Sequence, residues 1–153
     1  MTPSQLVLRV LLEGAIGALL LVAIAFLLSR FTKDIVGRAF LVILLFTATG
    51  AYFGFVVMSG VGPIWLLVEL LHIIVFGAMA LLGLRGSPYW LAIGWALHPV
   101  WDVGLHFIGP GNSFAPFTYT IACVSFDLVV ALYIAVAYGL IGARRLGLRN
   151  LGE

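Results

Sequence analysis

Charged residues are scarce in this chain. Asp, Glu, Lys and Arg make up only 9% of its 153 residues, whereas about 25% is usual in a soluble domain. Hydrophobic residues make up 63% of the chain, and the mean hydropathy is +1.21. This composition excludes an ordinary soluble domain and predicts a polytopic membrane protein.

Cysteine is nearly absent as well. The one cysteine, Cys123, falls inside an apolar segment, so the chain has neither a disulfide framework nor a thiolate metal site. A small packing side chain is the expected role for Cys123. The sequence also lacks a linker, a low-complexity tract and a detectable internal repeat. Residues 1–153 are therefore expected to form a single transmembrane helical domain.

Long apolar runs, in contrast, follow one another along the whole chain. A helix needs about 20 apolar residues to cross a bilayer, and five such runs can be recognised. They predict an all-α integral membrane bundle of five transmembrane helices, at residues 6–29, 37–60, 63–84, 88–108 and 117–142.

Basic residues are distributed unevenly between the connections. The second and fourth connections contain none, whereas the first, the third and the C-terminal segment contain Arg30, Lys33, Arg38, Arg85, Arg144, Arg145 and Arg149. Because cytoplasmic loops collect Lys and Arg, this pattern places the N-terminus outside and the C-terminus in the cytoplasm. We expect a protein of the bacterial inner (plasma) membrane whose partner is membrane lipid. The excess of positive charge reflects this orientation and gives no support to nucleic-acid binding.

Arg9 departs from this charge pattern. It lies four residues before Glu13, so we expect the two side chains to form a structural ion pair near the outer interface.

Small residues predict close helix packing. Gly14 and Gly17, and the pair Gly50 and Gly54, would allow a neighbouring helix to approach closely. Such surfaces suit packing inside the bundle as well as a homodimer or a larger membrane complex. Pro99 removes one backbone donor in the fourth segment and predicts a bend there.

No lysine or arginine lies among the acids and imidazoles of the last three segments. A rise of 1.5 Å per residue places five of these side chains roughly 9–15 Å below the predicted outer surface. They are Glu69, His72, His98, Asp102 and Asp127. A buried ionisable group in lipid costs roughly 2.5 kcal/mol or more, so the acids must be protonated or must hold a cation.

The spacing of these residues favours a shared site. Glu69 and His72 are three residues apart and share one helix face, as ligands of a common ion do. His98, Asp102 and His106 repeat every four residues and form a stripe about 12 Å long, which is too long for all three to bind one ion. His106 lies nearest the outer surface, so we expect it to be a gate, a residue that orients a ligand, or an interfacial residue.

Imidazoles and carboxylates without thiolates suit zinc, iron or manganese, and we favour zinc. The predicted metal ligands are His72, His98, Asp102, Glu69 and Asp127. Whichever of Glu69 and Asp127 is not needed as a ligand is the predicted catalytic base for an activated water. The leading hypothesis is a metal-dependent hydrolase that acts on a lipid or another apolar substrate from the bilayer.

Other functions are compatible with the same residues. A transport module would bind protons or a small cation at these groups and relay them without catalysis. An accessory membrane subunit would use them only to hold its helices together. A b-type haem between His72 and His98 is a further alternative, although the nearby acids make a poor porphyrin pocket.

The segment Leu97-His98-Pro99-Val100-Trp101-Asp102, followed by His106 and by Phe126-Asp127, resembles a group of small uncharacterised bacterial membrane proteins. Those proteins carry a His-Pro-x-Trp-Asp element on their penultimate helix. This resemblance covers about the last third of the chain and implies a functional site without naming a reaction. A looser similarity is to membrane hydrolases of the alkaline ceramidase type, which hold zinc through histidines and an aspartate. The chain lacks their His-x-x-x-His and Ser-x-x-x-His pairs and has fewer helices.

Overall fold

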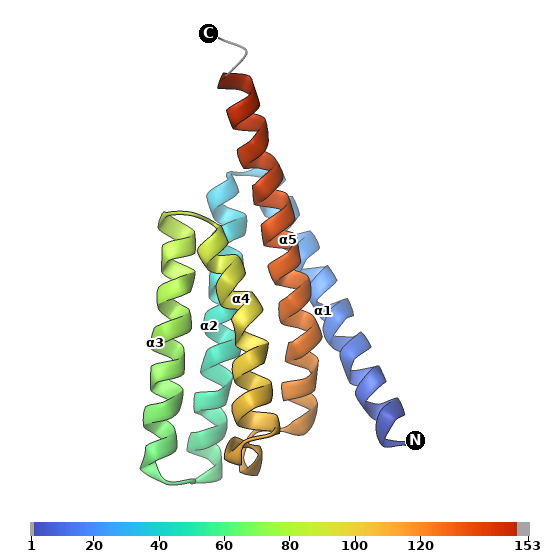
Figure 1. Ribbon diagram of the computed structural model, residues 1–153, viewed down its shortest axis with the longest axis vertical. Coiled ribbons are helices and arrows are strands. Elements are labelled where there is room, and N and C mark those ends of the chain that lie inside the picture. Colours follow the sequence, from blue (N-terminus) through green and yellow to red (C-terminus); the bar gives the residue numbers. More distant parts are fainter. Residues whose placement is uncertain (1, 150–153) are drawn as a thin grey trace.

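The computed structural model describes the backbone of residues 2–149 and the side chains of residues 2–138. Within this range the chain is all-α, as the sequence predicts. Its elements are α1 (Pro3–Phe31), α2 (Asp34–Ser59), α3 (Pro63–Arg85), α4 (Tyr89–Trp101), the π-helix η1 (Asp102–Phe107), the 3₁₀-helix η2 (Pro110–Ser113) and α5 (Phe117–Arg149). The α-helices run alternately up and down, so α1 begins at the end of the bundle opposite to that where α5 ends (Figure 1).

Local sequence signals explain where the helices begin and end. Thr2 and Gln5 cap the start of α1 reciprocally, because each side chain accepts a hydrogen bond from the other residue's backbone N–H. Gly60 ends α2 with a φ of 68°, a left-handed conformation that glycine adopts without strain. Pro63 then opens α3 at a position where a helix has no use for the missing N–H.

Four of the predicted spans are long apolar helices that can cross a membrane by length and composition. They are α1, α2, α3 and the part of α5 from Phe117 to Tyr138. Large apolar side chains cover their outer faces; Leu20 and Leu132, for example, are 64% and 65% exposed. Such surfaces need lipid rather than water around them, which indicates an integral membrane protein.

The remaining predicted span, residues 88–108, is divided in two. The α-helix α4 continues through Pro99 to Trp101, and the chain then widens into the π-helix η1. Pro99 lies inside α4, and the π turn begins three residues after it. The bend that Pro99 predicts stays a prediction. Such π turns are rare and frequently occur at functional sites.

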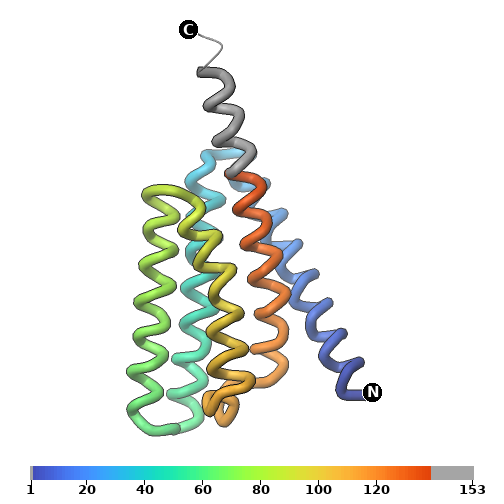
Figure 2. Tube along the Cα trace, in the orientation of Figure 1, coloured from blue at the N-terminus to red at the C-terminus, as the bar shows by residue number. Residues whose placement is uncertain are grey.

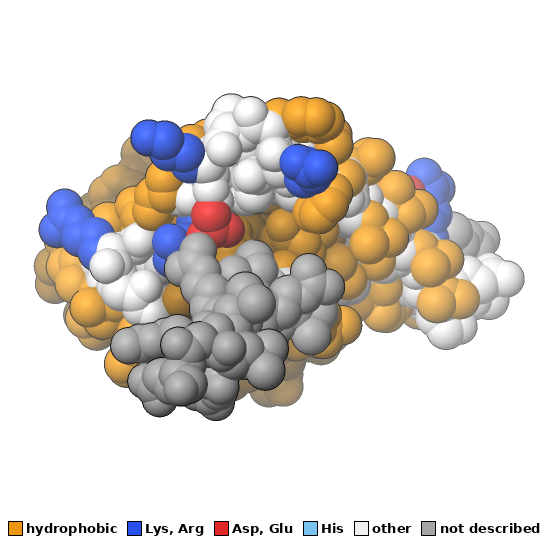
Figure 3. All heavy atoms as spheres, turned by 90° about the horizontal axis from the view of Figure 1, so that it is seen from above, with side chains coloured by type: hydrophobic (Ala, Val, Ile, Leu, Met, Phe, Trp, Pro, Cys, Tyr) orange, Lys and Arg blue, Asp and Glu red, His pale blue; other side chains and the backbone are white. Residues whose placement is uncertain are grey.

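Basic side chains gather at the end of the bundle that carries the α1–α2 and α3–α4 connections, seen from above in Figure 3. Arg38 pairs with Asp34 at 3.3 Å and donates a hydrogen bond to the Gly83 carbonyl, which links α2 to α3. At the far end of α1, Arg9 and Glu13 form the predicted ion pair at 2.7 Å. The side of the membrane that each end faces, and the choice of membrane, stay predictions.

The close approach expected at Gly14 occurs inside the bundle. Helix α1 packs against α2 and α5 (Figure 2), and a Cβ at Gly14 would collide with the Ala122 carbonyl oxygen of α5. Ser125 adds a hydrogen bond of 2.7 Å from its hydroxyl to the Leu11 carbonyl across the same contact. At Gly50 and Gly54 an added Cβ would meet nothing within 4 Å, so within the described chain these two glycines mediate no close contact.

Two buried apolar clusters lie along the bundle. The larger cluster is built around Leu41, Leu45, Leu91, Trp95 and Ile134. The smaller one contains Tyr52, Val56, Phe114 and Ala115, near the end of α2 and the start of α5. The polar residues singled out by the sequence lie between these clusters, in the interior of the protein.

Substitution of Gly14 tests the α1–α5 contact. We expect Gly14→Ala to destabilise the protein by about 1–3 kcal/mol, because the new methyl group overpacks a backbone contact that cannot yield easily. Gly54→Ala is the matched control, since its methyl group enters open space, and it should be neutral or slightly stabilising. Thermal unfolding in detergent micelles measures both variants. Equal melting temperatures for the two would contradict this account of the packing.

Candidate metal centre

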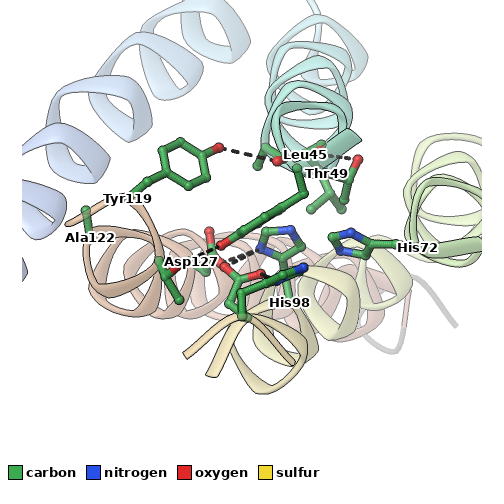
Figure 4. A network of polar contacts seen from close by, with 12 residues as sticks. Leu45, Thr49, His72, His98, Tyr119, Ala122 and Asp127 are labelled. Carbon is green, nitrogen blue, oxygen red and sulfur yellow. Dashed lines mark hydrogen bonds and ion pairs between the residues drawn. The ribbon is translucent and has the colours of Figure 1, made fainter. Parts of the chain in front are cut away.

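Six ionisable side chains from α3, α4, η1 and α5 meet in the interior of the bundle. Five of them, Glu69, His72, His98, Asp102 and Asp127, are fully buried, and His106 is 2% exposed. Figure 4 shows His72, His98 and Asp127 converging from three helices beside α2. The side chains that the sequence predicts to converge therefore lie together in the structure.

Two histidines are each held by a carboxylate. The Nδ1 atom of His72 lies 3.0 Å from Glu69 Oε2, and that of His98 lies 2.7 Å from Asp127 Oδ2. With both carboxylates ionised, each Nδ1 would donate its proton to the carboxylate, and each Nε2 would be left with a lone pair. Neither Nε2 has a hydrogen-bond partner among the described residues. This is the arrangement in which metal-binding histidines are normally oriented by carboxylates.

Glu69 has both of its oxygens occupied. Besides accepting from His72, it accepts from His106 Nε2 at 2.8 Å through Oε1. His106 is thus buried rather than interfacial, and it contacts the predicted ligand Glu69. The π turn of η1 explains this position, because its wider turn changes the direction of His106 relative to a regular helix.

Asp102 is the least satisfied residue of the cluster. Neither of its carboxylate oxygens has a hydrogen-bond partner in the described structure, although the side chain is completely buried. The nearest charged contacts are His98 Nδ1 at 3.4 Å and His106 Nδ1 at 4.0 Å. A buried carboxylate without a partner is strongly unfavourable, so Asp102 requires a proton or a cation.

Aromatic rings enclose the polar groups. Tyr52 stacks on His106 with 3.9 Å between ring centroids, and Trp101 stacks on His72 at 4.8 Å. Phe76 packs edge-on against His72 and His98. Such walls keep water out and lower the local dielectric constant, which strengthens any interaction between the cluster and a cation.

Tyr52 was not identified from the sequence. It is fully buried on α2, and its hydroxyl lies 3.4 Å from the Thr120 hydroxyl. The sequence did contain a signal for its position at the cluster. Tyr52 is eight residues before Gly60, which places it about 12 Å from that end of the helix. This depth matches that of Glu69 and His72.

The connection between η1 and α5 closes one end of the site. Phe114 packs against His106 and against Trp65, and all three rings meet near the η2 turn. Gly111 in this turn lies so close to the His106 ring that an added Cβ would be 2.7 Å from its Cδ2. The cluster is therefore covered at this end by apolar side chains and backbone.

Three of the cluster residues can hold a metal ion. One ligand atom from each of His72, His98 and Asp102 lies within 4.8 Å of the others. Bonds of about 2.0–2.1 Å to zinc place tetrahedral ligands roughly 3.4 Å apart, so only a small closure is needed. Two histidines and one carboxylate, with a fourth position open, are a donor set that catalytic zinc sites use.

The structure gives the other predicted ligands a different environment. Glu69 and Asp127 are engaged in orienting histidines, although Asp127 Oδ1 has no hydrogen-bond partner among the described residues. The nearby Ser125 does not supply a hydrogen bond to Asp127. Its hydroxyl donates to the backbone carbonyls of Leu11 and Ala122 instead.

The geometry does not suit a haem held by His72 and His98. Their rings are stacked face to face, with 5.0 Å between centroids and 18° between planes. Two axial haem ligands must instead point at the iron from opposite faces of a porphyrin. Trp101 and Phe76 occupy the surrounding space, so the residues present do not fit that group.

The sequence profile of a family of unknown function (DUF6010) matches residues 13–144. The chain belongs to this family. The match confirms the resemblance to an uncharacterised group and extends over all five α-helices, so the family shares the part of the chain that builds the cluster. No curated protein and no solved structure shows a significant match.

The role of Tyr52 can be tested by two substitutions. Tyr52→Ala should destabilise the protein by about 3–5 kcal/mol, because it removes a buried ring that packs on three histidines. Tyr52→Phe keeps the ring and loses the hydroxyl, which contacts Thr120 and interacts with Asp102, so about 1 kcal/mol is expected. Melting temperatures in micelles measure the difference. Equal losses for Tyr52→Phe and Tyr52→Ala would show that the hydroxyl, and not the ring, matters.

Proposed function

We propose that this protein binds one divalent metal ion, zinc in preference to iron or manganese, inside the membrane. The ligands are His72, His98 and Asp102. The observation that carries the proposal is the set of buried atoms without partners: Nε2 of both histidines and both oxygens of Asp102. Each of these atoms is a lone-pair donor, and they belong to the residues that lie within ligand distance of one another.

The polar network favours a metal over protons alone. Full protonation of the imidazoles would neutralise the three carboxylates, but it would also create buried N–H groups at His72 Nε2, His98 Nε2 and His106 Nδ1 that have no acceptor. An orphaned charged donor in a dry interior is costly. A metal ion would instead accept the lone pairs of these nitrogen atoms. The same atoms that would be unpaired donors in a protonated cluster would be ligands in a metal site.

A metal with an open coordination position can act as a Lewis acid and can activate water for hydrolysis. We propose hydrolysis of an apolar substrate as the reaction class. Asp127 is the better candidate for the general base, because its Oδ1 is free while both Glu69 oxygens are occupied. Asp127 would accept the proton of the attacking water, and His98 would keep its orientation through Oδ2.

A proton relay is the alternative that a specific observation favours. Acids and imidazoles alternate from Asp127 to His98, Asp102, His106 and Glu69, with successive distances of 2.7, 3.4, 4.0 and 2.8 Å. The two contacts of Asp102 are not hydrogen bonds, so a water molecule or a small side-chain movement would complete the chain there. Such a chain can pass protons without a metal. The two functions differ in metal content, which the next experiment measures.

Metal analysis tests the metal site directly. Wild-type protein, purified without chelators and analysed by inductively coupled plasma mass spectrometry, should contain nearly one equivalent of zinc, iron or manganese. His72→Ala, His98→Ala and Asp102→Asn should each lose most of it. Glu13→Gln is the control, because Glu13 is exposed and pairs with Arg9 away from the cluster. Added zinc should raise the melting temperatures of the wild type and of Glu13→Gln, but not those of the three ligand variants.

Substitutions of the orienting carboxylates refine the same test. Glu69→Gln and Asp127→Asn should weaken zinc binding about 10- to 100-fold without abolishing it. Metal-free wild-type protein that gains no stability from added metals would refute the metal site. Proton uptake into proteoliposomes by that metal-free protein would then support the relay.

Hydrolysis has its own test. Zinc-loaded protein in mixed micelles should cleave a fluorogenic long-chain ester, and Asp127→Asn at saturating zinc should lower the rate by at least about 100-fold, the usual contribution of a general base. Glu69→Gln under the same conditions should retain more activity than Asp127→Asn. Absence of turnover in a zinc-loaded wild-type sample would reject the hydrolase and leave metal binding unaffected.

A further inference from the structure

A cavity of about 260 Å³ lies between α1, α2 and α5, beside the polar cluster. Its lining includes Leu21 of α1, Leu44 and Ala48 of α2, and Phe126 and Asp127 of α5. Asp127 is therefore shared: its Oδ2 accepts from His98, and the residue also forms part of the cavity wall.

The other polar groups in this wall either already have hydrogen-bond partners or form only weak hydrogen bonds. The Tyr119 hydroxyl donates to the Ala48 carbonyl at 3.3 Å, and the Thr47 hydroxyl donates to the Ile43 carbonyl at 2.9 Å. Cys123 contributes a buried thiol, which is a weak hydrogen-bonding group. Asp127 Oδ1 is thus the one strong acceptor in the described lining that lacks a partner.

The position of the cavity gives it access to lipid. Thr47 in its lining is exposed on the outer face of α2, as is the neighbouring Ile43, which is 62% exposed. In contrast, Phe114, Trp65 and the η2 turn cover the end of the polar cluster. A ligand from the bilayer can therefore enter the cavity sideways, between helices. Asp127 is fully buried in its wall, so a small movement of this side chain would bring Oδ1 to the ligand.

We propose that this cavity binds a single hydrocarbon chain whose polar end carries a hydroxyl or amide N–H that donates to Asp127. The size supports one chain, since pockets for larger organic ligands typically occupy about 300–1,000 Å³. The wall is apolar apart from the groups named above, which suits a chain and rejects a charged headgroup. This proposal deepens the proposed function by defining its substrate class, but it does not depend on a bound metal.

Photolabelling in vesicles tests the proposal. The probe is hexadecanol with a diazirine near the end of its chain, and its methyl ether is the matched probe without a donor. Mass spectrometry of the labelled peptides should show label concentrated on the lining residues Leu21, Leu44 and Phe126. The alcohol should label them several-fold more than the ether does.

Variants identify the cavity as the place of labelling. Ala48→Phe fills it, and Thr47→Trp blocks its exposed side, so both should lower labelling of the lining several-fold. Ala78→Phe is the control, because Ala78 is exposed on α3, away from the cavity. Two variants are used so that loss of the fold in one, which its melting temperature reveals, leaves the other as the test.

The result also separates this proposal from the metal site. Labelling is measured with zinc and with a chelator, and preferential labelling in both samples supports the cavity even if zinc fails to bind. Label spread evenly over lipid-facing helix surfaces, unchanged by Ala48→Phe and Thr47→Trp, would overturn the proposal. Equal labelling by alcohol and ether would overturn the role of Asp127 as acceptor.

Discussion

The structure depends on one electrostatic constraint, a group of carboxylates buried in a membrane protein without a lysine or arginine beside them. Within the described residues, the arginine ion pairs are those of Arg9 with Glu13 and of Arg38 with Asp34, away from the cluster. The cost of burying the acids is offset partly by three histidines that donate to Glu69 and Asp127. Asp102 receives no such bond. Its burial therefore requires a positive charge that the chain does not supply, either a proton or a cation.

The fold makes this polar group tolerable by surrounding it with rigid apolar material. The cluster lies between two buried apolar layers, and Tyr52, Phe76 and Trp101 pack directly on its imidazoles. Close helix contacts, such as that at Gly14, hold the layers in place. The π turn after Trp101 contributes by directing His106 toward Glu69. A regular helix would direct His106 differently, and Glu69 would lose one of its two histidine contacts.

Much of this arrangement follows from sequence patterns, and the remainder depends on contacts between helices. Apolar runs predict the helices almost to their ends, since lipid forces backbone polar groups into helical hydrogen bonds. Depth and four-residue spacing predict that Glu69, His72, His98, Asp102 and Asp127 come together. Spacing does not reveal which atoms pair, so the contacts of Glu69 with His72 and of Asp127 with His98 were not foreseen. The role of Glu69 and Asp127 as metal ligands stays a prediction. Burial of His106 was missed because a regular 1.5 Å rise takes no account of a π turn or of the η2 cover.

The charge balance of the cluster would link the proposed metal chemistry to proton chemistry. With neutral imidazoles, three ionised carboxylates carry three negative charges, of which one divalent ion compensates two. A low-dielectric interior does not tolerate the remaining charge, so a metal-loaded site would retain one proton on its network of acids and imidazoles. That proton would move between Asp127 and Glu69 only if the two contacts of Asp102 closed to hydrogen bonds. The proposed metal site would then have both elements of acid–base catalysis, a lone pair at Asp127 and a mobile proton beside it, without a lysine or arginine in the cluster.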